Sequence, residues 1–167
     1  TYLVDDADFV SVSQFAFLER RDVLARARRG ATVLVNSPHG PDEVWDHLPV
    51  EVQQEVVDQG LVLHVVDADR VAREAGMDGR INAVMQPCFF ALSGVLEPEL
   101  ALAAIRAQIE RTYAKAGPAV IERNLAAVDA ALGALAPVPT PVAVTAGFGR
   151  PPVVPATVPD FVERVTA

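Results

Sequence analysis

The chain contains a single cysteine, Cys88, among its 167 residues. One cysteine cannot form an intrachain disulfide, and it cannot supply the four thiolates that hold an iron–sulfur cluster. This low cysteine content is typical of a cytoplasmic protein. Cys88 follows a proline in an apolar segment and has no histidine or basic residue close to it in the sequence. We therefore expect a buried, unreactive thiol rather than a nucleophile.

Positive charge is scarce as well. The chain has 14 basic and 22 acidic residues, which gives a formal net charge of −8. Nucleic acids and anionic membranes bind basic surfaces, so neither is expected as a general partner, although a local basic pocket remains compatible with this balance. No apolar run approaches the roughly 20 residues of a membrane-spanning helix, and the N-terminus lacks the pattern of a signal peptide. The missing initiator Met predicts a segment of a longer polypeptide.

The residues that are present predict an α/β fold. Short apolar runs rich in β-branched residues predict strands at Phe9–Ser13, Thr32–Val35 and Leu61–Val66. Helices are expected between and after them, at about residues 14–29, 41–48, 50–59, 67–75, 81–92, 98–113 and 118–135. This alternation predicts helices layered on a mostly parallel sheet. Three strands make a thin sheet, so we expect the domain to lack an N-terminal strand–helix unit.

Glycine and proline mark the expected boundaries. Gly30 is predicted to end the helix at 14–29, and Pro87 to kink or split the helix at 81–92. Seven of the 13 prolines lie between residues 137 and 159, which predicts an extended connector or wrapping arm. A short helical turn is expected at residues 160–165. The predicted organisation is thus an α/β domain at residues 1–136 and a Pro-rich connector or arm at residues 137–167.

The chemistry-bearing residues do not form a complete active site. No glycine-rich turn follows the first predicted strand, so the dinucleotide-binding pattern is missing and Asp67 is better interpreted as a helix cap. The histidines, His39, His47 and His64, show no metal-ligand spacing with one another or with Cys88. We predict no catalytic residue and no metal ligand in this chain.

Two short polar groups are the candidate ligand-binding residues. Asn36 and Ser37 follow a predicted buried strand, where side chains and amides can face a ligand, but both are also ordinary turn residues. Arg80 and Asn82 lie at a predicted helix start, which favours a phosphate or carboxylate. The alternative is that Asn82 caps the helix and Arg80 pairs with Asp78 or with a neighbouring domain.

Five segments resemble, in order and spacing, one known family. They are Ala7–Val10, Gly30–Pro38, Gly79–Phe90, Tyr113–Gly117 and Asn124–Asp129. Together they resemble the gamma-type domain of the pyruvate:ferredoxin (flavodoxin) oxidoreductases, within the 2-oxoacid oxidoreductases. The resemblance covers roughly Thr1 to Pro139, and Pro159–Val162 resembles the connector to the next domain. In that family a Gly-rich segment precedes the part at which this chain begins.

The resemblance implies a parent enzyme that converts pyruvate and coenzyme A (CoA) to acetyl-CoA and CO₂ and reduces ferredoxin or flavodoxin. It also implies thiamine diphosphate and [4Fe–4S] clusters on other domains, a homo-oligomeric full enzyme, and a gamma-type domain near the CoA side of the active site. Asn36, Ser37, Arg80 and Asn82 would then be the residues nearest the ligand. The alternative is a stand-alone interaction module that docks through the Pro-rich arm and the apolar stripe at Ile121–Leu135.

Overall fold

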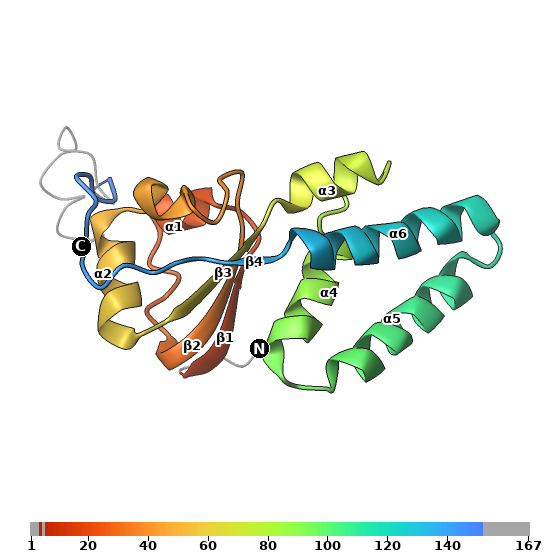
Figure 1. Cartoon of the computed structure of the whole chain (residues 1–167), viewed down its shortest axis with the longest axis horizontal. Helices are drawn as coiled ribbons and strands as arrows, with labels where there is room; N and C mark the ends of the chain where they lie inside the picture. Colours follow the sequence, from red (N-terminus) through yellow and green to blue (C-terminus); the bar gives the residue numbers. More distant parts are fainter. Residues whose placement is uncertain (1–3, 5, 152–167) are drawn as a thin grey trace, which may run out of the picture.

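The computed structural model describes Val4 and residues 6–151 as an α/β structure (Figure 1). A four-stranded sheet has the order β1-β2-β3-β4. The strands are β1 (Ala7–Val12), β2 (Ala27–Asn36), β3 (Val62–Val66) and β4 (Ala136–Pro137). β1, β2 and β3 are parallel, and β4 pairs antiparallel with β3. The predicted α/β fold with a mostly parallel sheet is confirmed, and β4 is a strand that the sequence did not predict.

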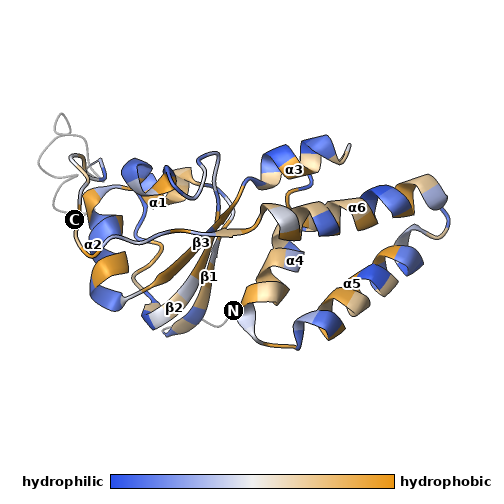
Figure 2. Ribbon diagram, viewed as in Figure 1, coloured by the Kyte–Doolittle hydropathy of each residue, from blue (hydrophilic) through white to orange (hydrophobic). Residues whose placement is uncertain are grey.

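Side chains on alternate positions of the strands enter two separate cores. Val33 and Val35 of β2 pack on one face, under α1 (Ala16–Arg20), the 3₁₀ helix η1 (Val44–His47) and α2 (Val50–Gln59). Leu34 packs on the other face, under α3 (Ala68–Glu74), α4 (Asn82–Ser93) and α6 (Pro118–Ala134). Figure 2 shows the apolar residues concentrated along the strands between these layers. Burial on both faces explains why these strands are nearly all apolar.

The predicted helix at 14–29 is wrong over most of its length. Only α1 is helical there, and β2 begins at Ala27. Asp22 accepts a hydrogen bond from the Ala25 amide (3.1 Å), which forms a local turn in place of a helical one. Gly30, with a φ of +74°, lies inside β2 instead of ending a helix. The β1–β2 register shifts at this point, so Gly30 belongs to an irregular stretch of strand.

The other helices follow the prediction more closely. α2 ends at Gly60, which is in the left-handed conformation and donates its backbone amide to the Val57 carbonyl oxygen (3.3 Å). Asp67 caps α3 by accepting a hydrogen bond from the Arg70 amide (2.9 Å). Only the four-residue η1 forms within the helix expected at 41–48. α4 continues through Pro87, so the predicted split is wrong. α5 (Pro98–Tyr113) and α6 form a hairpin that extends away from the sheet (Figure 1).

The described part of the Pro-rich segment, up to residue 151, lies against the first half of the chain. Gln53 is fully buried, and its side-chain oxygen accepts hydrogen bonds from the amides of Thr145 (2.8 Å) and Ala146 (2.9 Å). Its side-chain nitrogen donates to the Trp45 carbonyl oxygen (2.7 Å). We call residues 138–151 the arm. The helical turn expected at 160–165 lies outside the described residues.

Arg150 anchors the far end of the arm. Its backbone amide donates to the Glu51 carboxylate, and its side-chain Nε donates to the Leu18 carbonyl oxygen (3.1 Å). Its guanidinium also pairs with Glu55 at 3.4 Å. The arm therefore joins α1, η1 and α2. The division of the chain at residue 137 stays a prediction, and β4 spans that position.

Candidate functional site

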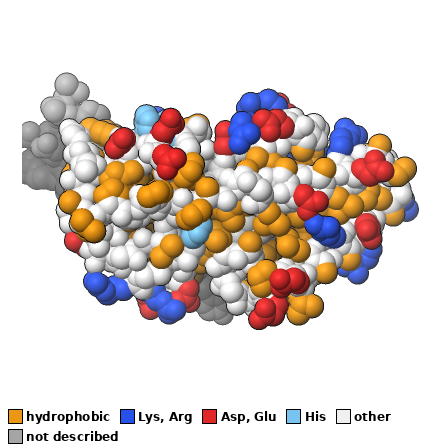
Figure 3. Space-filling view, viewed as in Figure 1, with side chains coloured by type: hydrophobic (Ala, Val, Ile, Leu, Met, Phe, Trp, Pro, Cys, Tyr) orange, Lys and Arg blue, Asp and Glu red, His pale blue; other side chains and the backbone are white. Residues whose placement is uncertain are grey.

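A groove of about 770 Å³ lies between α4, α5 and α6. Its apolar wall comes from residues on all three helices: Phe90, Ile105, Ile109 and Val128. Arg80 and Arg111 are the charged residues that line it, and no acidic residue does. In a chain with a net charge of −8, this is a local cationic and apolar surface. Figure 3 shows apolar side chains gathered along the surface between α5 and α6.

Arg80 reaches from the start of α4 to the end of α5. It follows Gly79, whose φ of +76° permits the turn that leads into α4. The Arg80 guanidinium donates a hydrogen bond to the Tyr113 hydroxyl (3.2 Å), at an exposed position. Among the described residues the Arg80 side chain therefore bonds to Tyr113, and the alternative pairing with Asp78 does not form. Tyr113 therefore orients the Arg80 guanidinium at the groove.

Asn82 is the first residue of α4 and lies exposed in the same groove. Ile81 occupies the N-cap position without a side-chain cap, so the interpretation of Asn82 as the cap is wrong. The amides of Ala83 and Val84 donate to the carbonyl oxygens of Arg80 and Ile81, both at 3.0 Å. These amides are therefore engaged within the turn. Anion recognition at this groove has to come from side chains more than from the helix end.

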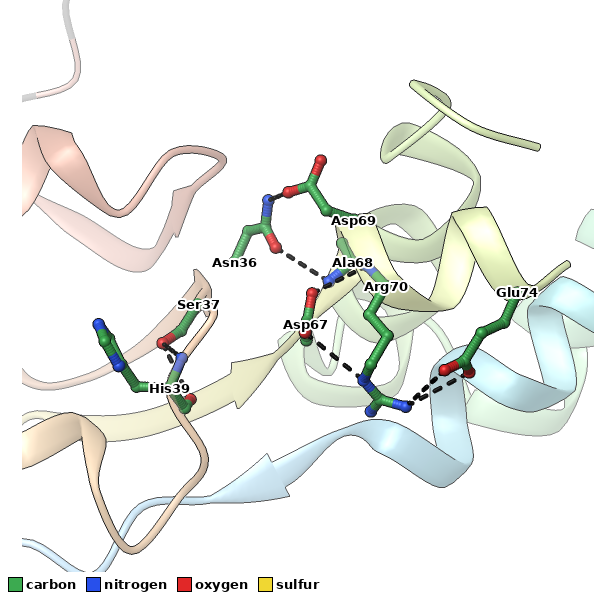
Figure 4. A network of polar contacts seen from close by, with 8 residues as sticks. All are labelled: Asn36, Ser37, His39, Asp67, Ala68, Asp69, Arg70 and Glu74. Atoms are coloured by element: carbon green, nitrogen blue, oxygen red, sulfur yellow. Dashed lines mark hydrogen bonds and ion pairs between the residues drawn. The ribbon is translucent and has the colours of Figure 1, made fainter. Parts of the chain in front are cut away.

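Asn36 and Ser37 lie elsewhere, at the carboxyl edge of β2, and both are buried. Asn36 donates to the Ser13 carbonyl oxygen (3.0 Å) and to Asp69 (2.9 Å), and it accepts from the Ala68 amide (2.9 Å). Figure 4 shows Asn36 directed toward the start of α3. The side chain thus ties the ends of β1 and β2 to α3.

The Ser37 side chain also forms its hydrogen bonds within the chain. Its hydroxyl both donates to the His39 carbonyl oxygen and accepts from the His39 amide, each at 3.0 Å. The four candidate residues thus form two separate groups, and only Arg80 and Asn82 line the groove. A ligand-facing role for Asn36 and Ser37 stays a prediction, and their contacts favour a structural role.

The histidines do not assemble a metal site in the described part of the chain, where no group of three or more His, Cys, Asp or Glu side chains converges. His39 stacks on His47 with ring centroids 3.6 Å apart and planes 7° apart. Burial, followed by the neighbouring His47, lowers the pKa of His39. Burial also lowers the pKa of His64. Both changes favour neutral rings.

Cys88 is fully buried in the core between α4 and α6. Its sulfur lies 3.6 Å from the Ala131 carbonyl oxygen. Burial raises the pKa of the thiol to about 12, so the thiolate is almost absent at neutral pH. The expectation of a buried thiol is confirmed, and its lack of reactivity stays a prediction.

Comparison with known proteins identifies the family of the chain. Residues 1–134 match the family model described as "Pyruvate ferredoxin/flavodoxin oxidoreductase". The chain belongs to this family. It is 51% identical over 166 residues to the pyruvate-flavodoxin oxidoreductase of Rhodospirillum rubrum, covering 99% of the chain and 14% of that relative. It is 29% identical over 164 residues to the pyruvate:ferredoxin oxidoreductase of Moorella thermoacetica, covering 98% of the chain and 14% of that relative.

A solved structure supports the fold assignment. The pyruvate oxidoreductase subunit PORC of Thermotoga maritima matches with a TM-score of 0.58 and 20% identity, over 80% of this chain and 66% of that one. At that identity the match shows the fold alone. The chain spans about 14% of the length of the curated relatives quoted above. In the described residues, no helix is both long and apolar enough to cross a bilayer.

The sequence missed several residues of the groove. Arg111 and Gln86 line it, and Tyr113 holds Arg80, yet none was a candidate. Tyr113 lies 33 positions from Arg80, so no local spacing connects the two. Only the pairing of α5 with α4 brings them together, and the sequence pattern of one helix cannot show its partner. In the sequence, Tyr113 was singled out only as the first residue of Tyr113–Gly117, one of the segments that carry the family resemblance.

Proposed function

We propose that this chain is a segment of a pyruvate oxidoreductase. The complete enzyme would convert pyruvate and CoA to acetyl-CoA and CO₂ and pass the electrons to ferredoxin or flavodoxin. The observation that carries this proposal is the 51% identity over 166 residues to a pyruvate-flavodoxin oxidoreductase. The family resemblance adds a cytoplasmic, homo-oligomeric enzyme to the proposal.

The redox and thiamine chemistry belongs, in this proposal, to other domains of the same enzyme. The described residues do not fit an iron–sulfur cluster, because the one cysteine is buried with a pKa of about 12. A cluster requires several thiolates, and none is accessible here. Thiamine diphosphate requires ligands for its diphosphate-bound metal ion, and the described residues hold no cluster of acidic or histidine side chains. No catalytic step is therefore assigned to this chain.

The contribution of the segment is to hold the CoA side of the site. CoA combines phosphate groups with a long, partly apolar arm, and the groove offers two arginines beside an apolar wall. Arginine suits phosphate because its planar guanidinium donates two parallel hydrogen bonds. Arg80 is held in place by Tyr113, which lowers the cost of ordering this side chain on binding. Asn82, at the same groove, adds an uncharged donor and acceptor.

A binding titration tests the groove. The 167-residue chain is titrated with CoA by calorimetry, alongside Arg80→Ala and the control Arg106→Ala. Arg106 lies on α5 but pairs with Asp129 and does not line the groove. A hydrogen bond to a charged group contributes about 1.5–3 kcal/mol, so Arg80→Ala should weaken binding by roughly 10- to 150-fold.

The control separates this groove from general charge effects. Arg106→Ala removes the same charge and should bind like the wild type. Equal binding by the wild type and Arg80→Ala, or no binding by either, would remove the CoA-side role from this segment. Equal losses in both variants would show nonspecific attraction and would also refute a defined site.

A further inference from the structure

We propose that the connection between α4 and α5 is a docking surface for another part of the same polypeptide. Val95, Leu96 and Leu100 form this surface, which we call the apolar corner. Their exposed fractions are 67%, 46% and 66%. Eight large hydrophobic residues are exposed in the described part of the chain, and three of them lie within these six positions. Single exposed apolar residues are ordinary on protein surfaces, whereas a cluster marks a contact site.

The local fold presents the corner outward. Gly94 adopts a left-handed conformation with a φ of +64°, which ends α4 abruptly. Pro98 occupies the first turn of α5, so the chain reverses between the two helices within residues 94–97. Only Ala101 of α5 is fully buried. The corner therefore lies where α4 gives way to α5, at the end of α5 opposite the α5–α6 turn (Figure 1), and its three side chains stay exposed among the described residues.

Acidic residues border the corner and define the chemistry of its partner. Glu97 and Glu99 are exposed on either side of Pro98. In Figure 3 apolar and acidic side chains gather together at the lower edge of the hairpin. Electrostatic complementarity then requires an opposing surface with an apolar centre and lysine or arginine at its margin.

The size of the corner favours a tethered partner over a free one. A stable complex between separate molecules buries about 800 Å² on each partner, which three side chains do not supply. A partner on the same polypeptide binds at an effective concentration in the millimolar range, so a small surface suffices. The chain spans only 14% of the Rhodospirillum relative, so most of such a polypeptide lies outside this segment. A second copy of the corner is disfavoured because it would bring four glutamates together.

Thiol labelling tests the docking. Leu100→Cys is made in the 167-residue chain and in the full-length oxidoreductase that carries it, and maleimide modification of residue 100 is followed by mass spectrometry. The native Cys88 is buried and stays unlabelled, so it does not interfere. We expect labelling at least about tenfold slower in the full-length protein, because docking makes modification depend on local opening. Ala107→Cys, at an exposed position of the same helix, reports the general reactivity of α5 in both proteins.

The outcomes separate the possible partners. Slower labelling of residue 100 in the full-length protein, relative to residue 107, supports the proposal. Equal labelling in the two proteins overturns it, as does protection that appears only at high concentration of the 167-residue chain or only after addition of ferredoxin or flavodoxin. Leu100→Asp in the full-length protein should increase hydrogen exchange at residues 94–100, and unchanged exchange would also count against docking. The proposal rests on the place of this segment in a longer enzyme, and CoA binding measured in parallel shows whether that function survives if docking fails.

Discussion

Replacing Gln53 with leucine should release the arm and destabilise the fold. The Gln53 side chain makes three short hydrogen bonds, two to amides of the arm and one to the Trp45 carbonyl oxygen. Each contributes about 1 kcal/mol net, so Gln53→Leu should lower the free energy of unfolding by about 3 kcal/mol. Leucine has a similar volume, which keeps the cavity contribution small. For a domain of this size the change lowers the melting temperature by about 6–12 °C.

Gln54→Leu is the matched control for this prediction. Gln54 is exposed, and within the described part of the chain its side chain hydrogen-bonds only with Asp58, one turn further along α2. Its replacement should therefore change stability by less than about 0.5 kcal/mol. Urea unfolding of the 167-residue chain measures both variants. Hydrogen exchange should accelerate at the Thr145 and Ala146 amides in Gln53→Leu alone. If the two variants unfold within about 1 kcal/mol of each other, Gln53 does not hold the arm.

Two further predictions follow from groups with shifted pKa values. With a pKa of about 12, roughly one Cys88 thiol in 10,000 is ionised at pH 8, so a maleimide should modify it only after unfolding in urea. Labelling of the folded chain at the rate of a free thiol would contradict its burial. The lowered pKa of His39 means that the unfolded chain binds protons more readily than the folded chain, so this residue costs stability as the pH falls below its ordinary pKa of 6.5. Urea unfolding at about pH 7.5 and pH 5 should therefore show a larger loss in the wild type than in His39→Gln, and equal losses would refute the linkage.

The sequence predicted the layers because burial has a strong local signature. Apolar runs rich in β-branched residues, such as Thr32–Val35, are typical of strands covered on two faces. Gly60 and Asp67 mark the end of α2 and the start of α3 by short-range chemistry. The prediction for residues 14–29 was wrong because the apolar and basic residues of this segment fit a helix and a strand equally well. The pairing of Ala27 with Ala7 of β1 decides between them, and that contact is not local.

The candidate site was predicted only in part for the same reason. Arg80 and Asn82 were visible as polar residues at a helix start, and the structure places both at the groove. The position of Asn36 after a predicted strand also suggested a ligand-facing residue. Its side chain instead bonds with Ala68 and Asp69 of α3, and the position of α3 depends on parts of the fold that the local sequence does not show. β4 was missed because Ala136 and Pro137 have weak strand propensity and pair only through β3.

The arm also has a consequence for folding during synthesis. Gln53 leaves the ribosome 93 residues before its partner Ala146. At about 5–20 residues per second, the interval between them is roughly 5–20 s. During that time the carboxamide of Gln53 lacks its arm partners, and the indole of Trp45 lacks the Thr145 hydroxyl to which it donates (3.0 Å), so the first half of the chain stays incompletely packed. A slow stretch of translation between these residues would prolong exposure of that surface to chaperones and proteases.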